Sequence, residues 1–323
     1  MVEPKSRRIL VVGCGAIGGV FAAALTRAAD VVGYDTNREH VRAIQSGGLR
    51  VRTGGSERTV PLSAVHDAAA LNGQRFDAVL FLTKSKATAQ AVAQLGPALD
   101  QRPLLVTLQN GMGNSDVLLG VPGCVVARGV TMDAGRYVEP GCVEHLLHSK
   151  TWLGPLKGTV EDLRWFGVAG AAAGLDLEII ADPMGAVWAK FLFNSVMNPI
   201  GALLLGVNAA RYESPEVSAL IDDMTAEGER VIRALGGSFA FDPMEYVKKV
   251  RAGQAPLSKH AGSMALDIAR GATTEVDELT GYIVSEGERL GIPVPACKTV
   301  YRLVKGLEIA AKYRAPGGTP GGT

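Results

Sequence analysis

The sequence has few cysteines, little net charge and no long apolar run free of polar residues. Its four cysteines, at positions 14, 124, 142 and 297, form no CxxC pair and no metal-ligand spacing. A disulfide framework or a structural metal is therefore not expected. The formal net charge of the 323 residues is +1, and the basic pairs at 7–8 and 248–249 stand alone, which argues against a nucleic-acid partner.

The most apolar later stretch, residues 191–207, is interrupted by Asn194, Asn198 and Pro199. A membrane span rarely tolerates that many polar or helix-breaking residues, so no membrane partner is expected. The N-terminal residues also lack the sustained apolar core of a secretory signal, and we expect a cytoplasmic protein. The composition, 47% hydrophobic and 20% charged, is typical of a globular chain long enough for two domains.

Apolar runs alternate with helical patterns in the first half of the chain, which predicts a mostly parallel sheet with helices on both faces. The expected strands are 9–12, 31–34, 78–82 and 104–108, and the expected helices are 17–28, 38–46 and 87–97. Between 123 and 154, shorter strand-like runs with turn residues between them predict less regular strands that extend this sheet.

Strand signals stop after about residue 181, and only helical patterns follow. The expected helices are 183–205, 214–235, 242–252, 274–290 and 295–313. Asp182 can cap the first of them, and Pro183 suits its first turn. We therefore expect an α/β domain at 6–181, an all-helical domain at 182–313 and a disordered tail at 314–323 that is rich in Gly, Pro and Thr.

Gly13, Gly15 and Gly18 form a G-x-G-x-x-G pattern directly after the first strand and at a helix start. The first glycine permits a tight turn, the second lets backbone approach a pyrophosphate, and the third lets helix and strand pack closely. The helix N-terminus adds free N–H groups and a positive dipole. The pattern predicts a Rossmann-type dinucleotide site; the alternative is a tight turn without a ligand.

The second expected strand ends at Asp35, twenty residues beyond Gly15. A carboxylate there normally accepts hydrogen bonds from the ribose hydroxyls of NAD, and it would repel the 2′-phosphate of NADP. Asp35 therefore favours NADH. Two alternatives stay open: Asp35 could be a solvated turn acid, or Arg38 could reach a phosphate if Asp35 turned away.

Lys190, Asn194 and Asn198 follow one another at intervals of four residues within an otherwise apolar helical pattern. Four residues advance only about 40° beyond a full turn, so the three side chains share one helix face. Because burying such groups without partners is costly, the stripe predicts a functional surface. The alternative is a stripe that faces solvent.

Ser263 and Glu275 are less informative on their own. Thr274 could cap a helix that begins at Glu275, with Asp277 completing a capping box. The helix dipole alone would then explain the carboxylate of Glu275, and Ser263 could equally be a surface or capping residue.

Three segments in this order after the glycine turn resemble the ketopantoate reductase (2-dehydropantoate 2-reductase) family. They are TLQNGMG at 107–113, KFLFNSVMN at 190–198 and SMALDIARGATTEVD at 263–277. The resemblance runs from Ile9 to about Lys312. It implies an α/β fold, with an N-terminal Rossmann-type parallel-sheet domain and an all-α C-terminal domain like that of 6-phosphogluconate dehydrogenase. It also implies an active cleft between the two domains.

The resemblance further implies roles for single residues. Lys190 would lie against the substrate ketone as general acid, Glu275 would bind a substrate hydroxyl and organise Lys190, and Ser263 would bind the carboxylate end. The other substrate-site residues implied are Asn110, Asn194, Asn198 and Asn208. The cofactor-site residues implied are Gly13, Gly15, Ala16, Ile17, Gly18, Asp35, Lys84, Asn110 and Glu275.

The activity implied is reduction of 2-dehydropantoate to (R)-pantoate, a step of pantothenate biosynthesis, with NAD(P)H. Negative charge grows on the ketone oxygen during hydride transfer, and a nearby ammonium stabilises that charge and can deliver the proton. The family default is NADPH, whereas Asp35 favours NADH. Alternatives are an NAD-dependent D-2-hydroxyacid dehydrogenase of the same family with another 2-oxo acid, and a non-catalytic dinucleotide-sensing protein. The helical domain is apolar enough to form a homodimer.

Overall fold

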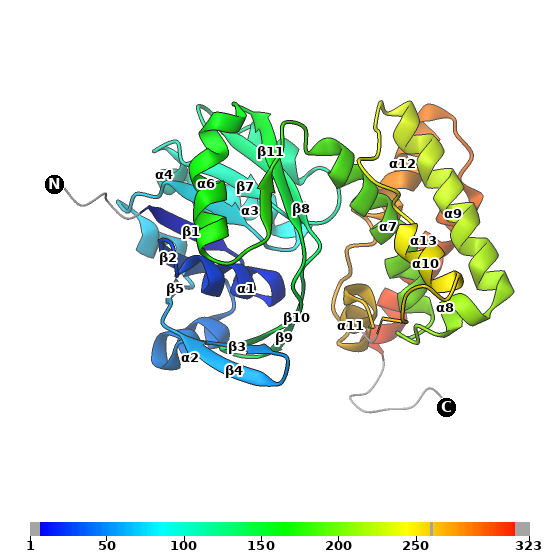
Figure 1. The fold of residues 1–323 in the computed structure, drawn as a ribbon, viewed down its shortest axis with the longest axis horizontal. Helices are drawn as coiled ribbons and strands as arrows, with labels where there is room; N and C mark the ends of the chain where they lie inside the picture. Colours follow the sequence, from blue (N-terminus) through cyan, green and yellow to red (C-terminus); the bar gives the residue numbers. More distant parts are fainter. Residues whose placement is uncertain (1–6, 259–260, 314–323) are drawn as a thin grey trace. The chain divides into compact units, whose positions relative to one another are not determined.

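The computed structural model describes residues 7–258 and 261–313, and the expected tail at 314–323 lies outside them. The chain divides into two compact units between Pro183 and Met184. Figure 1 labels the elements of both units. Among the described helices, none combines the length and the apolarity that crossing a membrane requires.

The first unit is built on an eight-stranded sheet with the order β12-β11-β8-β7-β6-β1-β2-β5. Six of its strands run parallel to one another, while β11 runs antiparallel to β8 and β12 follows the direction of β11. The strand bounds are β1 Arg8–Val12, β2 Asp30–Tyr34, β5 Ser63–Val65, β6 Ala78–Phe81, β7 Leu104–Thr107, β8 Val126–Thr131, β11 Thr151–Lys157 and β12 Leu177–Ile179.

Both faces of this sheet are covered by helices (Figure 1). In β1, Ile9 and Val11 belong to one buried cluster and Leu10 and Val12 to another, which is the two-residue alternation of a strand. Helices α1 (Ala16–Leu25) and α6 (Val160–Ala172) contribute to the first cluster. The helices α3 (Thr88–Gln94), α4 (Gly96–Leu99) and α5 (Asn114–Leu119) cover the other face. The predicted sheet with helices on both faces is confirmed.

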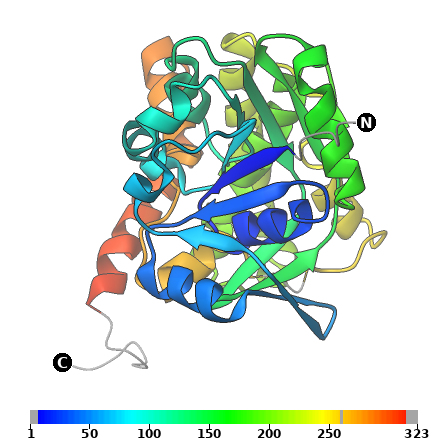
Figure 2. The same ribbon diagram turned by 90° about the vertical axis from the view of Figure 1, so that its left-hand side faces the viewer.

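A second sheet, with the order β4-β3-β10-β9, was not predicted from the sequence. Its strands are β3 Leu49–Thr53, β4 Ser56–Val60, β9 Ala134–Glu139 and β10 Cys142–Leu147, and Figure 2 shows the β3–β4 hairpin. Only β8 and β11 of the segment 123–154 extend the main sheet, so the expectation for that segment was wrong in part. Strands β9 and β10 belong to the second sheet instead, which packs on α1: Val51 of β3 and Val143 of β10 share a buried cluster with the apolar residues of α1.

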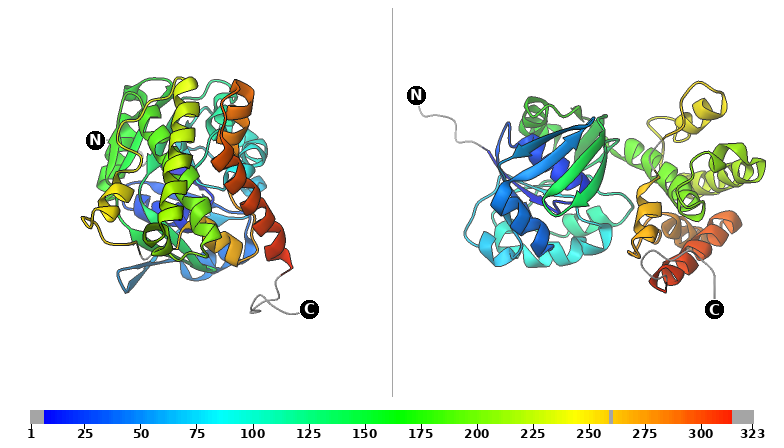
Figure 3. Two further views of the ribbon diagram at one scale, coloured as in Figure 1. Left: turned by 90° about the vertical axis from the view of Figure 1, so that its right-hand side faces the viewer. Right: turned by 90° about the horizontal axis from the view of Figure 1, so that it is seen from below.

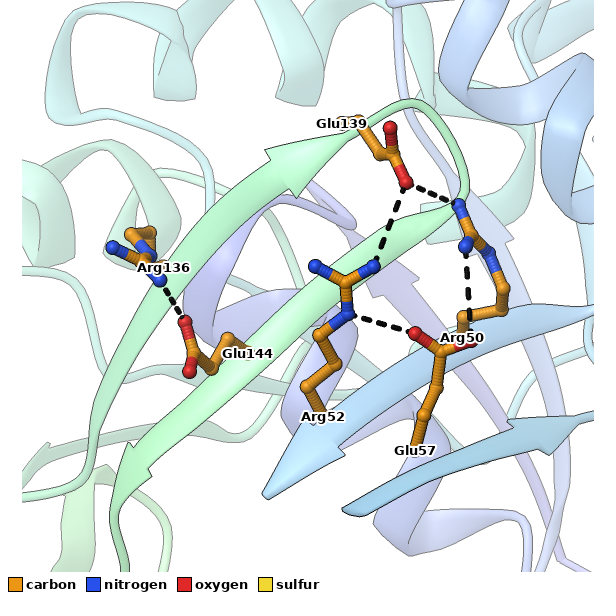
Figure 4. Close-up of polar contacts among 6 residues, drawn as sticks. All are labelled: Arg50, Arg52, Glu57, Arg136, Glu139 and Glu144. Carbon is orange, nitrogen blue, oxygen red and sulfur yellow. Dashed lines mark hydrogen bonds and ion pairs between the residues drawn. The ribbon is translucent and has the colours of Figure 1, made fainter. Parts of the chain in front are cut away.

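The second sheet carries ion pairs between exposed or partly exposed side chains (Figure 4). Arg50 Nη2 lies 2.7 Å from Glu139 Oε1, and Arg52 Nε lies 2.7 Å from Glu57 Oε2. Arg136 pairs with Glu144 across β9 and β10. Such exposed pairs contribute at most about 1 kcal/mol each, so they mark the solvated face of the sheet, and the apolar contacts with α1 hold it in place.

Helices joined by turns and loops make up the described part of the second unit, which contains no strand (Figure 3). Its central helix, α7, packs against α9, α11, α12 and α13. The helix bounds are α7 Met184–Leu203, α8 Ala210–Glu213, α9 Pro215–Ala234, α10 Glu245–Arg251, α11 Ser263–Ala269, α12 Thr280–Leu290 and α13 Pro295–Lys312. The short helices α8 and α11 were not predicted, and Pro183 precedes α7, outside its first turn.

Helix α12 begins at Thr280 and ends at Leu290, so the helix expected at 274–290 is confirmed from residue 280 on, and its expected start was wrong. Residues 274–279 form a turn segment instead. Thr274 Oγ1 accepts a hydrogen bond from Val276 N at 3.2 Å, as in a turn, and donates to Glu308 Oε1 at 2.8 Å. The start of a helix therefore does not explain Glu275.

Candidate active site

The glycine turn joins β1 to α1 at the point where the strand order of the main sheet reverses. Strand β1 has β2 on one side and β6 on the other. In open α/β sheets, ligands bind outside the carboxyl ends of the strands at this switch point. The turn therefore lies where a dinucleotide is expected.

The three glycines of the turn meet different surroundings. Gly13 has a φ of +88°, and a Cβ there would lie 2.8 Å from Thr83 N. A Cβ on Gly18 would lie 1.7 Å from the carbonyl oxygen of Gly13. A Cβ on Gly15 would meet nothing within 4 Å, and Ala16 and Ile17 follow it as the first residues of α1. The turn is crowded toward the protein and open at Gly15, which fits a pyrophosphate at the N-terminus of α1.

Cys14, between the first two glycines, is held by both of its backbone groups. Its N–H donates to Asp35 Oδ2 at 2.8 Å, and its carbonyl lies 2.9 Å from His40 Nε2. Gly141 N donates to His40 Nδ1 at 2.9 Å, so the ring proton is on Nε2 and is donated to Cys14. No local pattern in the sequence indicated that the buried His40 braces the glycine turn.

Asp35 directly follows β2 and is half-buried. Besides Cys14 N, its carboxylate accepts a hydrogen bond from Asn37 N at 2.8 Å. Asn37 caps α2 (Arg38–Gly47), and Arg38 is exposed at the start of that helix. The structure thus places the Asp35 carboxylate beside the glycine turn and gives it a bracing function that the sequence did not predict.

The loops that follow β6 and β7 are tied to each other. Ser85 Oγ and Asn114 Nδ2 each donate to the carbonyl of Asn110, both at 2.8 Å. Gln109 Nε2 donates to the carbonyl of Thr83 at 2.8 Å. Lys84 and Asn110 follow the carboxyl ends of β6 and β7, as the glycine turn and Asp35 follow those of β1 and β2. Because these four strands are parallel, all of these residues lie at one edge of the sheet, where Lys84 is exposed.

In the second unit, α7 contains Lys190, Asn194 and Asn198, and the spacing of four residues puts them on one face. Asn194 is 8% exposed, while Lys190 and Asn198 are half-buried. The stripe is therefore not one that simply faces solvent. Leu192 and Val196 of the same helix are fully buried in its apolar packing.

Glu275 lies in the turn segment 274–279, which α13 holds at two points. Glu308 Oε1 accepts hydrogen bonds from N and Oγ1 of Thr274, both at 2.8 Å. Asp277 accepts from Tyr301 Oη at 3.0 Å and from Lys305 Nζ at 3.1 Å. Residues on both sides of Glu275 are therefore anchored to α13.

Glu308 is itself an ionised, largely buried group, with 8% of the residue exposed. Burial alone would raise the pKa of Glu308, but hydrogen bonds from Lys305 and Thr274 outweigh burial and lower it. Lys305 Nζ lies 2.8 Å from Glu308 Oε2. The clamp on residues 274–279 therefore depends on a charged carboxylate.

Asn208 follows α7, and Ser263 begins α11. Asn208 Nδ2 donates to the carbonyl of Ser258 at 2.5 Å. A Cβ on Gly206 would lie 2.8 Å from the Cβ of Ala261, so the turn after α7 packs on the segment that leads to Ser263. Ser263 is the exposed first residue of α11, a helix that packs on α7.

The first unit also brings together Asp133, His145 and His148, which sequence reasoning missed. Asp133 Oδ1 lies 2.8 Å from His145 Nε2 and 3.6 Å from His148 Nδ1, and it accepts from Ser149 N at 3.0 Å. Burial alone would raise the pKa of Asp133, but hydrogen bonds from His145, Ser149 and Thr131 outweigh burial and lower it. Hydrogen bonds from three neighbouring residues therefore satisfy this carboxylate.

Two family models cover most of the chain. The model described as ketopantoate reductase PanE/ApbA matches residues 9–158, and the model of its C-terminal domain matches residues 182–308. The 2-dehydropantoate 2-reductase of Halobacterium salinarum is 34% identical over 306 residues, which cover 92% of this chain and 98% of that protein. The one of Pyrococcus horikoshii is 28% identical over 93% of this chain and 97% of its own.

Solved structures of similar proteins share the architecture. A PanE/ApbA family ketopantoate reductase from Ralstonia eutropha superposes with a TM-score of 0.83 at 30% identity, over 95% of this chain and 100% of that chain. A D-mandelate dehydrogenase solved with NADH and anilino(oxo)acetate has a TM-score of 0.84 at 21% identity, over 94% and 99%. The family models and the curated relatives define a nicotinamide-dependent oxidoreductase of a family that acts on small keto acids. Within that class, the chain belongs to the ketopantoate reductase family, as its motifs predicted.

Proposed function

We propose that this protein reduces 2-dehydropantoate to (R)-pantoate in the cytoplasm. The observation that carries the proposal is the polar face of α7, where Lys190 shares one side of an apolar helix with Asn194 and Asn198. The relatives named 2-dehydropantoate 2-reductase support the choice of substrate. We assign residues 6–181 as the dinucleotide-binding domain and residues 182–313 as the substrate domain.

The cofactor would be held by the first unit. The pyrophosphate would lie at the glycine turn, because the space beside Gly15 is open. The residues of this turn are Gly13, Gly15, Ala16, Ile17 and Gly18. Asp35 would accept hydrogen bonds from the adenosine ribose, and Lys84 and Asn110 would line the same sheet edge. When bound, a reduced nicotinamide supplies the hydride.

Lys190 would act on the substrate ketone. Its ammonium donates a hydrogen bond to the ketone oxygen, stabilises the negative charge that grows there and delivers the proton. Glu275 would accept a hydrogen bond from a substrate hydroxyl and orient the Lys190 ammonium, and Ser263 would bind the carboxylate. Asn194, Asn198 and Asn208 would orient the substrate chain.

Asp35 supports NADH as the preferred cofactor. Its carboxylate is fixed beside the glycine turn by Cys14 N and Asn37 N. Each carboxylate oxygen keeps a lone pair that could accept a hydrogen bond from a ribose hydroxyl. A 2′-phosphate at that place would meet a like charge, unless the exposed Arg38 and Lys84 neutralised it.

The alternative substrate is another 2-oxo acid, as in a D-2-hydroxyacid dehydrogenase. Comparing kcat/KM for 2-dehydropantoate with kcat/KM for phenylglyoxylate and branched 2-oxo acids decides between the two. We expect 2-dehydropantoate to be preferred, because its hydroxyl can bind Glu275. A higher value for phenylglyoxylate would favour the alternative.

The Glu275→Gln variant sharpens this comparison. It should narrow the gap in kcat/KM between 2-dehydropantoate and 2-oxo acids that lack a hydroxyl, because a neutral amide oxygen accepts a weaker hydrogen bond from the hydroxyl than a charged carboxylate does. Glu245→Gln on α10, which removes an ion pair with Lys249, is the matched control and should leave the ratio unchanged. A Glu275→Gln variant with an unaltered ratio and only a lower melting temperature would assign Glu275 a structural role.

A further inference from the structure

Asp133, His145 and His148 meet where the chain passes between the two sheets of the first unit. Asp133 lies between β8 of the main sheet and β9 of the second sheet, His145 lies in β10, and His148 lies between β10 and β11. Each residue offers one ligand atom, and the three atoms all lie within 4.8 Å of one another. Because twelve positions separate Asp133 from His145, the sequence did not predict a metal site here.

The distances within this cluster match those between ligands of one zinc ion. Histidine nitrogens and carboxylate oxygens bind zinc at about 2.0–2.2 Å, so at tetrahedral angles two such atoms lie about 3.3–3.6 Å apart. Asp133 Oδ1 lies 2.8 Å from His145 Nε2 and 3.6 Å from His148 Nδ1. A shift of about 0.5 Å in the first of these contacts would therefore admit the ion.

The carboxylate of Asp133 is held by two groups that are not part of the cluster. Its side chain is 1% exposed, Ser149 N donates to Oδ1 at 3.0 Å, and Thr131 Oγ1 donates to Oδ2 at 3.0 Å. Side chains that bind zinc are oriented by outer hydrogen bonds of this kind. A metal ion would leave both bonds in place and would replace only the hydrogen bond from His145.

His148 directs Nδ1 at the same carboxylate without forming a hydrogen bond, since 3.6 Å is too long for one. With its proton on Nε2, the ring presents a lone pair at Nδ1. That lone pair and the Asp133 carboxylate oxygen would then be two acceptors that face each other. A cation between them would bind both.

Space for an ion and its remaining ligands lies beside the two imidazoles. Both rings line a cavity of about 340 Å³, whereas one water molecule takes up only about 30 Å³. The side chain of His148 is 53% exposed, so an ion can enter from solvent. Three protein ligands leave a fourth coordination position for water.

Three other charged side chains, Arg27, Glu57 and Arg58, line this cavity. Glu57 is paired with Arg52 at 2.7 Å. Arg27 and Arg58 are exposed, so water weakens their repulsion of a metal ion. The buried carboxylate of Asp133, in contrast, would bond to the ion directly.

We propose that Asp133 Oδ1, His145 Nε2 and His148 Nδ1 bind a divalent transition metal ion such as zinc. Two imidazoles and one carboxylate suit zinc and similar first-row metals, whereas magnesium and calcium prefer oxygen ligands alone. When the ion takes the place of the proton on His145 Nε2, that proton moves to Nδ1 by exchange with solvent, so both rings bind as neutral imidazoles. The ion would fasten the junction between the two sheets.

The test is a titration of the untagged full chain after treatment with EDTA. Calorimetry should show one zinc ion bound per chain, cobalt should give the visible absorption of an ion bound by imidazole, and excess magnesium should not compete. His148→Ala should weaken zinc binding by about 10- to 100-fold or more, because even the loss of an outer hydrogen bond to a ligand costs that much. The control is His66→Ala, at the histidine that directly follows β5, and it should bind zinc as the wild type does.

Asp133→Asn is a second variant, which keeps the shape of the side chain but removes its charge, and it should also weaken zinc binding. His148→Ala decides if Asp133→Asn does not fold, because the exposed ring donates none of the hydrogen bonds that hold Asp133. Circular dichroism and melting curves without metal establish that a variant is folded. Absence of saturable zinc binding by the wild type would overturn the proposal, and so would equal zinc affinity of the wild type and folded His148→Ala.

Discussion

Lys190 is the one charged side chain of α7, and the proposed proton transfer depends on it. Lys190→Ala should lower kcat by about 10²-fold or more, because it removes both the proton donor and the charge beside the ketone oxygen. Cofactor affinity should change little, because we propose that the first unit binds the cofactor. Stopped-flow rates and cofactor titration on the same preparation measure the two effects.

The control for this variant is Lys249→Ala on α10, whose ammonium is exposed and paired with Glu245. It should keep wild-type kcat. Near wild-type turnover by Lys190→Ala across the pH range would remove Lys190 from the mechanism.

Because of Asp35, we expect the kcat/KM of the wild type to be about tenfold or more higher with NADH than with NADPH. A carboxylate a few ångströms from a phosphate costs about 1–4 kcal/mol at dielectric constants of about 80 to 20, and each 1.4 kcal/mol or so is one decade. Asp35→Asn removes the charge but keeps an acceptor for Cys14 N, so it should raise kcat/KM with NADPH and largely keep the glycine turn.

Asp35→Ala also removes the acceptor for Cys14 N, and it should weaken the binding of both cofactors. The two variants together separate the charge of Asp35 from its bracing function. A wild-type kcat/KM clearly higher with NADPH than with NADH would contradict the assignment, while leaving the hydride chemistry untouched.

Helix α13 acts as a clamp on the segment 274–279, and Glu308 is its charged contact. Because the folded-state pKa of Glu308 is lowered, its ionisation stabilises the fold fully above the ordinary glutamate pKa of 4.5. That stabilisation is lost as the pH falls through the lowered folded-state pKa. Glu308→Gln should therefore destabilise the protein by about 1–3 kcal/mol near neutral pH.

Urea unfolding at a series of pH values checks this expectation. The difference between wild type and Glu308→Gln should shrink as the pH drops below 4.5. Glu288→Gln, which removes the exposed pair with Lys298, should cost much less at every pH. A Glu308→Gln penalty that does not vary with pH would contradict the charged clamp.

Elements whose contacts are local were predictable from sequence, and those with distant partners were not. The glycine turn and the stripe on α7 each follow from a few consecutive residues. The brace on Cys14 needs Gly141 to meet His40 across 101 residues, and the turn at Thr274 needs Glu308, 34 residues away. The second sheet likewise pairs β3 with β10 in parallel, a pairing that no local pattern signals.

At the scale of the whole molecule, the two units divide the proposed work. The first presents an open glycine turn at a sheet edge, which suits a dinucleotide. The second presents Lys190 and two asparagines on α7, together with Glu275 in the segment that α13 holds. Such side chains suit a small polar substrate. Sequence predicted this division and the family, whereas the exact supports of each site residue emerged only from the fold.

The most direct test of the central claim is a product balance with the purified wild-type chain, 2-dehydropantoate and reduced cofactor. Pantoate is quantified by chiral chromatography, and cofactor oxidation is followed by its absorbance. We expect one (R)-pantoate for each nicotinamide oxidised, with faster turnover for NADH than for NADPH. Tight cofactor binding without turnover of 2-dehydropantoate or any other 2-oxo acid would contradict the account and indicate a dinucleotide-sensing protein.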